Sequence, residues 1–243
     1  MIEYQVLRSR RKTLTLQVKH GQVYVRAPLH LDEEFISSFI QKKSVWLEKK
    51  IIEQNQSVEL CCNFTQGSKM FFLGQLITLS VTFAKSGEKA GTFLSNISSE
   101  HQMLIVVLSK HVQRKSLNEI ALSIEVKKQL ERFLKHQAQL ILPPKIEYYS
   151  KLTNLEPTGI KIRQYSARWG SCNNRGELSF NYLLMMLPMH IIDYVIIHEL
   201  CHLRHLNHSK PFWQLVSEYF PNYVEAKKWI KSHQSALHWR SPV

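Results

Sequence analysis

The sequence lacks the long apolar segments by which membrane-spanning and secreted chains are recognised. Its longest apolar run, Met103 to Leu108, has the length of a strand, whereas a transmembrane helix needs about eighteen apolar residues or more. The first residues, MIEYQVLRSRRK, contain no apolar stretch of the kind that a secretory signal requires. We therefore expect a cytoplasmic protein with no membrane contact.

Cysteine is also scarce, with four residues in a chain of 243. Cys61 and Cys62 are adjacent, Cys172 follows a Gly-Ser pair, and Cys201 lies within a cluster of histidines. None of these spacings is that of a zinc ribbon or a redox-active CxxC motif, and a chain of this length does not need disulfide bonds for stability. We expect free and mostly buried thiols.

Acidic residues are few, because 19 Asp and Glu stand against 32 Lys and Arg, which gives a net charge of +13. Such an excess favours contact with a polyanion, either a nucleic acid or a nucleotide. A basic surface that serves only solubility is the alternative. The densest basic run contains Arg8, Arg10, Arg11 and Lys12. No pattern in the sequence predicts an oligomeric state.

The pattern of apolar residues predicts an α+β fold in two parts, with a boundary near residue 110. Residues 1–110 form a β-rich region, because several short segments alternate with period two. One helix is expected there, capped by Asp32 and extending from about Glu33 to Ile52. The apolar stripe of this helix consists of Phe35, Phe39, Trp46 and Leu47.

Residues 111–243 form the second part. A helical pattern extends to Leu142, and we expect the two prolines that follow, Pro143 and Pro144, to interrupt it. Two predicted strands, 160–163 and 178–184, flank a loop with the sequence RWGSCNNRG. Pro188 then opens a helix that leads into the histidine cluster.

The histidine cluster carries the chemistry, with four of the twelve histidines between positions 198 and 208. His198 and His202 are four residues apart, so a helix presents both imidazoles on one face, where they can share a metal ion. Glu199 lies about 100° round the helix, within reach of a water on that metal. This HExxH pattern predicts a zinc hydrolase in which Glu199 is the general base towards metal-activated water.

Two residues compete for the role of third ligand. His205 continues the helical stripe, but an imidazole one turn further lies about 4.5 Å beyond His202, which suits a tetrahedral ion poorly. His208 stands six residues after His202, the spacing found where the helix ends and the chain folds back. We therefore expect the metal ligands to be His198, His202 and His208.

The string HELCHLRHLNHSKPFW, preceded by YVII, closely resembles the YgjP-like metallopeptidase family, and RWGSC is that family's second hallmark. Weaker likeness extends over the rest of the chain. The resemblance implies that residues 111–243 form a zincin-like catalytic domain, related to SprT-like proteases, with these three histidines as zinc ligands and Glu199 as general base.

The loop before the second strand supplies a further candidate catalytic residue. Arg168 could stabilise a developing oxyanion or bind an anionic group of the substrate, and Trp169 could wall the cleft or pack in the core. If the strand at 177–184 lies at a sheet edge beside the metal, it could hold an extended peptide substrate by backbone pairing.

Three functions fit these residues. The first is a zinc-dependent metallopeptidase that acts on a peptide or protein. The second is a metal-dependent nucleotide phosphohydrolase, such as a nucleoside triphosphate pyrophosphatase, although such sites are usually rich in carboxylates and use magnesium. The third is a nucleic-acid-associated protein with a structural zinc, which would leave Glu199 without a role and normally closes all four positions with protein ligands.

Overall fold

The chain folds as two compact units that are separated in the sequence between Cys61 and Cys62. The computed structural model describes residues 2–19, 21–59, 62–96, 102–114, 118–165, 168–233, 237 and 239. The division lies earlier than the boundary near residue 110 that the sequence suggested. The strands between residues 69 and 108 were grouped with the first part, but their apolar side chains share one hydrophobic core with the later helices.

The smaller unit is a three-stranded sheet with two helices. Its strands lie in the order β1-β3-β2, with β1 parallel and β2 antiparallel to β3. The elements are β1 (Tyr4–Ser9), β2 (Thr15–Lys19), β3 (Gln22–Pro28), α1 (Glu33–Lys42) and α2 (Ser44–Glu59). Its core is small and consists of Val23, Val25, Ala27, Ile36, Ile40 and Leu47.

For the helix expected in this unit, the predicted start is confirmed and the predicted length is wrong. Asp32 caps it, since its carboxylate accepts a hydrogen bond of 2.6 Å from the backbone N–H of Phe35. The single helix expected up to residue 52 is two helices, because the first ends at Lys42 and the second begins at Ser44. Phe35 and Trp46 of the expected apolar stripe are exposed. The residues of these helices that are buried in the core are Ile36, Ile40 and Leu47, so only Leu47 of the expected stripe is buried.

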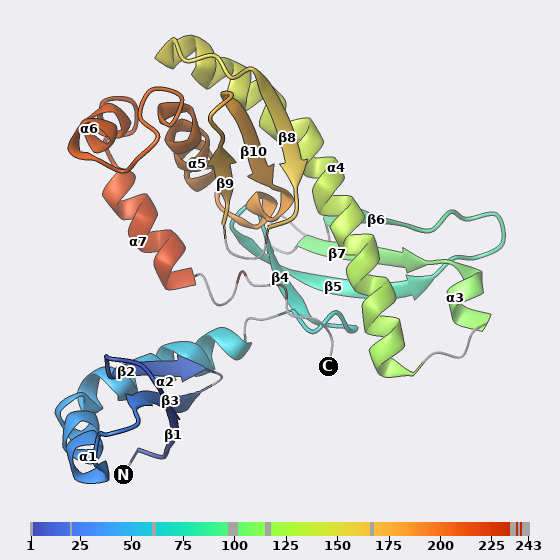
Figure 1. The fold of residues 1–243 in the computed structure, drawn as a ribbon. Coiled ribbons are helices and arrows are strands. Elements are labelled where there is room, and N and C mark those ends of the chain that lie inside the picture. Colours follow the sequence, from blue (N-terminus) through green and yellow to red (C-terminus); the bar gives the residue numbers. More distant parts are fainter. Residues whose placement is uncertain are drawn as a thin grey trace. The chain divides into compact units, whose positions relative to one another are not determined.

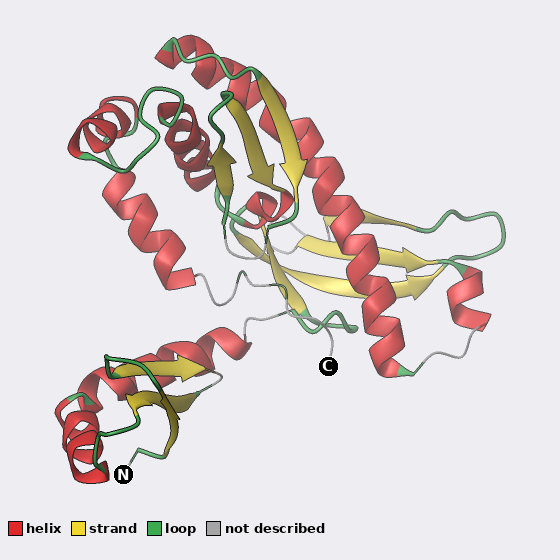
Figure 2. Cartoon of the chain, in the orientation of Figure 1, coloured by secondary structure: helices red, strands yellow, loops and turns green. Residues whose placement is uncertain are grey.

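The larger unit contains two mixed sheets, which confirms the α+β class (Figure 2). One has the strand order β4-β5-β7-β6, with β5 parallel to β7. The other has the order β8-β10-β9, with β10 parallel to β8 and antiparallel to β9. The strands are β4 (Lys69–Phe72), β5 (Gln75–Phe83), β6 (Gly91–Asn96), β7 (Gln102–Leu108), β8 (Gly159–Arg163), β9 (Gly170–Cys172) and β10 (Glu177–Asn181).

A single long helix, α4 (Glu119–Thr153), runs along both sheets of this unit (Figure 1). The short α3 (Lys110–Arg114) precedes it. The expected interruption at Pro143 and Pro144 is wrong, because both prolines lie inside the continuous helix. Tertiary packing outweighs the missing backbone donors. Buried positions recur every four residues on both sides of the prolines: Leu130, Leu134, Ala138, Leu142 and Ile146.

The segment that leads into the histidine cluster contacts α4 and the β4–β5 turn. It comprises the 3-10 helix η1 (Tyr182–Met186) and α5 (Met189–Cys201). Two helices follow the cluster, α6 (Lys210–Tyr219) and α7 (Tyr223–His233). Asp193 of α5 forms an ion pair of 2.7 Å with Lys145 of α4. In the β4–β5 turn, a Cβ on Gly74 would lie 2.6 Å from Pro188, so glycine lets this turn touch the start of α5. No helix in the described ranges is long and apolar enough to cross a membrane.

Candidate metal centre

Three histidines converge in the larger unit. His198 comes from the last turn of α5, His202 follows the helix as its C-cap, and His208 comes from the loop before α6. One ring nitrogen from each lies within 4.8 Å of the others. The Nε2 atoms of His198 and His208 are 3.0 Å apart. The arrangement can hold one metal ion.

The loop after α5 has two effects on the cluster: it orients the ring of His202, and it brings His208 close to His198 and His202. The backbone of His202 is still helical, with φ −67° and ψ −19°. Its Nδ1–H donates to the backbone carbonyl of His205 at 2.9 Å, which leaves Nε2 with a free lone pair on the side of the cluster. His205 thus contributes its carbonyl, and its imidazole is not part of the group of three.

Two aromatic rings at the start of α6 support the imidazoles. Phe212 is fully buried, and its ring stacks on that of His202 with centroids 4.5 Å apart. Trp213 stacks on His208 at 5.4 Å with an interplanar angle of 19°. Ring stacking on residues of α6 therefore orients His202 and His208.

The electrostatics of the cluster suit a metal ion. Burial, together with the neighbouring His202 and His208, lowers the pKa of His198 to about 3. Burial likewise lowers the pKa values of His202 and His208, so all three rings are neutral at pH 7 and offer lone pairs. Two imidazole nitrogens on a tetrahedral zinc ion would lie about 3.3 Å apart, close to the 3.0 Å between His198 and His208. The donor set fits zinc.

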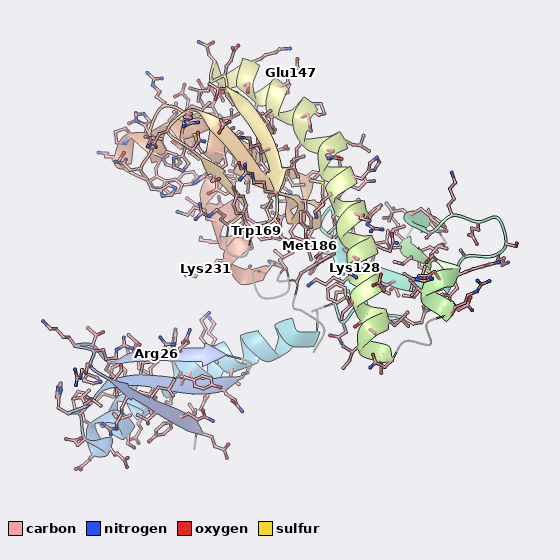
Figure 3. The ribbon with its side chains drawn as sticks, turned by 45° about the vertical axis from the view of Figure 1, so that its right-hand side comes forward. Arg26, Lys128, Glu147, Trp169, Met186 and Lys231 are labelled. Atoms are coloured by element: carbon pink, nitrogen blue, oxygen red, sulfur yellow. The ribbon has the colours of Figure 1, made fainter. Side chains whose placement is uncertain are left out.

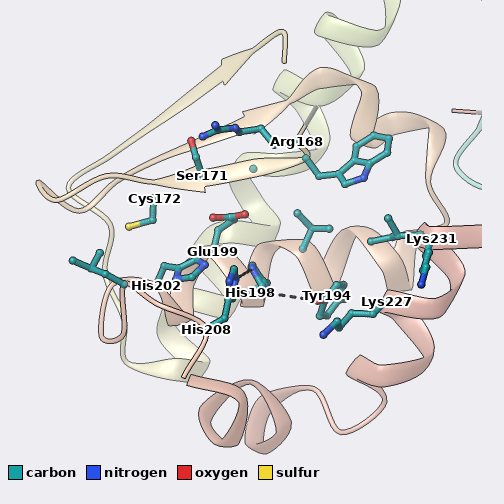
Figure 4. Close-up of a pocket in the computed structure, with 15 residues that line it drawn as sticks. Arg168, Ser171, Cys172, Tyr194, His198, Glu199, His202, His208, Lys227 and Lys231 are labelled. Atoms are coloured by element: carbon teal, nitrogen blue, oxygen red, sulfur yellow. Dashed lines mark hydrogen bonds between the residues drawn. The ribbon is translucent and has the colours of Figure 1, made fainter. Parts of the chain in front are cut away.

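Glu199 lies next to this cluster and is 6% exposed. Figure 4 shows its carboxylate between β9 and the three imidazoles. Burial raises the pKa of Glu199 to about 8, and the positive charge of Arg168 opposes that rise. A Cβ on Gly170 would lie only 2.6 Å from Cγ of Glu199. The glycine of the RWGSC motif therefore allows β9 to lie directly against the carboxylate.

Asn181 fixes the loop that carries Arg168. Its buried side-chain amide donates to the backbone carbonyls of Tyr165 at 3.0 Å and Arg168 at 3.1 Å. The guanidinium of Arg168 lies over the ring of Tyr165, 5.6 Å from its centroid, and the Tyr165 hydroxyl is 3.0 Å from Ser171 Oγ. These contacts hold Tyr165 and Arg168 close to each other just before the start of β9.

A pocket of about 590 Å³ contains the cluster, a size that suits a bound ligand. Trp169 and Lys231, both labelled in Figure 3, line it. Its lining also includes Tyr194 and Lys227, neither of which was predicted as a site residue. Tyr194 stands four residues before His198, and that spacing could have indicated a shared helix face. Nothing in the local sequence could have indicated the two lysines, because α7 reaches the pocket through tertiary packing.

The sheet edge beside the cluster is not the one expected. The strand predicted at 178–184 corresponds to β10, which is central and pairs with β8 and β9. The edge strand is β9, and its residues Gly170, Ser171 and Cys172 line the pocket. Any peptide that pairs with this sheet beside the cluster would meet β9.

The cysteines agree with the expectation where they are described. Cys172 and Cys201 form no disulfide, and Cys62 and Cys201 are buried. Burial raises the pKa of Cys201 to about 12, so its thiol remains protonated. Cys61 lies outside the described residues.

Comparisons with known proteins identify one family. The sequence profile of a family described as YgjP-like, metallopeptidase domain, matches residues 12–233. The solved structure of the metallopeptidase zymogen abylysin from Pyrococcus abyssi is similar to part of the chain, at 21% identity and a TM-score of 0.36. The match covers 39% of this chain and 96% of that one. Among curated proteins, none matches the chain.

Proposed function

The chain belongs to the YgjP-like family of metallopeptidase domains, and we propose that it hydrolyses peptide bonds with a zinc ion held by His198, His202 and His208. The convergence of three neutral imidazoles beside a buried carboxylate supports this proposal. Zinc bound there would act as a Lewis acid towards the substrate carbonyl and lower the pKa of water.

Glu199 is the general base of this proposal. A base works best when its pKa lies near the operating pH, and burial brings the pKa of Glu199 to about 8. Its carboxylate takes a proton from the attacking water and then delivers that proton to the leaving amine. Gly170 serves the reaction by leaving room for the carboxylate beneath β9.

Arg168 is the second catalytic residue of the proposal. Its positive charge favours the ionised form of Glu199, and its guanidinium offers donors to negative charge that develops on the substrate. Arg168→Gln should lower kcat about a hundredfold, and Arg168→Lys should recover part of that loss. An unchanged kcat in Arg168→Gln would restrict the catalytic residues to Glu199.

An extended peptide would bind along β9. This strand has one free edge within the described sheet and borders the pocket. Backbone pairing holds a peptide in register without regard to its side chains. The scissile bond would then lie between β9 and the imidazoles. Glu199 lines the same pocket.

The two competing functions have less support. A magnesium-dependent phosphohydrolase would need several carboxylates, and Glu199 is the single carboxylate among the residues described as lining the pocket. A structural zinc would need a fourth protein ligand, whereas the group of candidate ligands in the described part of the chain has three members.

Peptide mass spectrometry tests the proposal. Zinc-loaded protein is incubated with a library of peptides, and the cleaved sites are sequenced. We expect cleavage that a chelator abolishes, that zinc restores, and that Glu199→Gln reduces by about 10³-fold or more while metal content stays the same. Parallel incubation with nucleoside triphosphates is the control for the phosphohydrolase. Hydrolysis of triphosphates without cleavage of any peptide would overturn the proposal.

A further inference from the structure

Helix α7 presents two lysines to the pocket that contains the three histidines. Lys227 and Lys231 both line it, and because they are four residues apart their side chains leave the helix on the same face. Figure 4 shows both at the end of the pocket beside Tyr194, with Cys172 at the opposite end. The lysines therefore form a local site at one end of the pocket.

No described residue forms an ion pair with either lysine of this site. Among the described residues, the ion pairs involve other lysines, and none involves Lys227 or Lys231. The positive charge of Arg168 acts on Glu199, the single carboxylate of the described lining. Neither ammonium group therefore has an ionic partner among the described residues. Such groups in a concave site attract an anion.

The side chain of Lys227 is exposed, and a contact with an aromatic ring orients it. Its Nζ lies 3.8 Å from the centroid of the Trp213 ring, a cation–π contact. The ring of Trp213 also stacks with that of His208, at 5.4 Å, and with that of Tyr223, at 5.3 Å. The ammonium group thus contacts the ring that stacks on a candidate metal ligand, and an anion bound by Lys227 would lie in the same pocket as the three histidines.

We propose that Lys227 and Lys231 form a specificity subsite for a carboxylate of the peptide substrate, an inference that rests on the proposed peptidase function. The carboxylate is either an acidic side chain next to the scissile bond or the free C-terminus. A pair of ammonium groups matches one carboxylate. Both lysines are exposed, so a neutral peptide leaves them hydrated, whereas a carboxylate gains an ion pair with them; the site therefore favours the acidic peptide.

Matched peptides test the subsite. Capped peptides based on a cleaved sequence carry Glu or Gln at each position beside the scissile bond, and a second set carries a free or an amidated C-terminus. We expect one carboxylate-bearing peptide of a pair to have a kcat/KM at least about tenfold higher than its neutral partner. Comparison of the two sets distinguishes a side-chain carboxylate from the C-terminus.

Lysine variants assign that preference to α7. The double variant Lys227→Gln/Lys231→Gln should lower kcat/KM for the acidic peptide about 10- to 100-fold and leave that for the neutral peptide within about threefold. Lys231→Gln alone keeps the contact between Lys227 and Trp213 and should give a partial loss. Lys228→Gln removes a charge from the same helix but from a residue outside this pocket, and should change neither value. Lys231→Glu should shift the preference towards a basic residue.

Each other outcome would overturn the inference in a recognisable way. Equal loss with acidic and neutral peptides in the double variant would show a structural role for the lysines. Peptide cleavage without any preference for a carboxylate would reject the subsite and leave the proposed function standing. Absence of peptide cleavage would reject both. Glu199-dependent hydrolysis of triphosphates that the double variant abolishes would identify the anion as a phosphate.

Discussion

The two units of the chain differ in the amount of charge that they carry. Residues 1–61 contain ten Lys and Arg against seven Asp and Glu, whereas residues 62–243 contain twenty-two against twelve. Their net charges are therefore +3 and +10. The densest basic run of the sequence, residues 8–12, lies in the unit with the smaller excess.

They differ also in how their basic side chains are engaged. Arg8 donates to the backbone carbonyls of Leu29 and Leu31, and Arg11 donates to the hydroxyl of Thr13 at 3.2 Å. These side chains thus hold neighbouring loops of their own unit. Lys227 and Lys231 of the larger unit line a pocket without an ionic partner among the described residues. Density of charge in a sequence therefore does not identify a binding surface, because partners within the fold decide which charges remain available.

The largest effect that separates the units should come from the metal centre. His208→Ala should lower zinc affinity by more than about a hundredfold, because it removes one of three ligands, whereas His205→Ala should leave occupancy nearly unchanged. Elemental analysis of protein purified without chelator measures both. If His208→Ala kept its zinc and His205→Ala lost it, the third ligand would be His205 rather than His208.

Gly170→Ala should have the next largest effect. The added Cβ would lie 2.6 Å from Cγ of Glu199, so the carboxylate or the strand must move, and peptidase kcat should fall about 10- to 100-fold with zinc retained. Gly159→Ala is the matched control, since its Cβ would meet Glu177 at an ordinary 3.9 Å. Steady-state kinetics of the two variants compare them. Equal activities would show that the contact with Gly170 does not position Glu199.

A moderate effect on stability should distinguish the larger unit from the smaller. Asp193→Asn weakens the partly buried pair with Lys145, so we expect the larger unit to lose about 1–3 kcal/mol of unfolding free energy. The control Glu147→Gln breaks an exposed pair with Lys151 and should change little. Urea unfolding followed by hydrogen exchange reads each unit separately. A loss of hydrogen-exchange protection in residues 1–61 after Asp193→Asn would contradict the prediction that the effect is confined to the larger unit.

The smallest effect should come from the basic run of the smaller unit. If the net charge serves contact with DNA, affinity should fall with salt through counterion release. Arg10→Gln/Lys12→Gln, which alters two exposed side chains, should reduce the slope of log affinity against log salt by less than about one. Fluorescence anisotropy with a labelled duplex measures the slope. A reduction of about two would assign nucleic-acid contact to this run.

Several elements could be predicted because their signals are local. The cap at Asp32 depends on a side chain and a backbone N–H three residues apart, and the pair His198 and His202 depends on the pitch of one helix. Predictions that required a choice between faces or partners were less successful. Phe35 and Trp46 were placed in a core that contains Ile36 instead of Phe35, whereas Leu47 of the same stripe is buried as expected. An amphipathic pattern leaves neighbouring positions almost equivalent until a sheet covers one of them.

By itself the sequence indicated the class of fold through its apolar pattern and the family through motifs along the chain. It also predicted the histidines and the carboxylate of the candidate metal centre, because these residues lie close together in the chain. Only the tertiary structure decided that the units divide after Cys61, that β9 is the exposed edge, and that Gly170 lies against Glu199. It alone brought Lys227 and Lys231 into the pocket. The physical reason is that these features arise from contacts between distant segments, which no local spacing encodes.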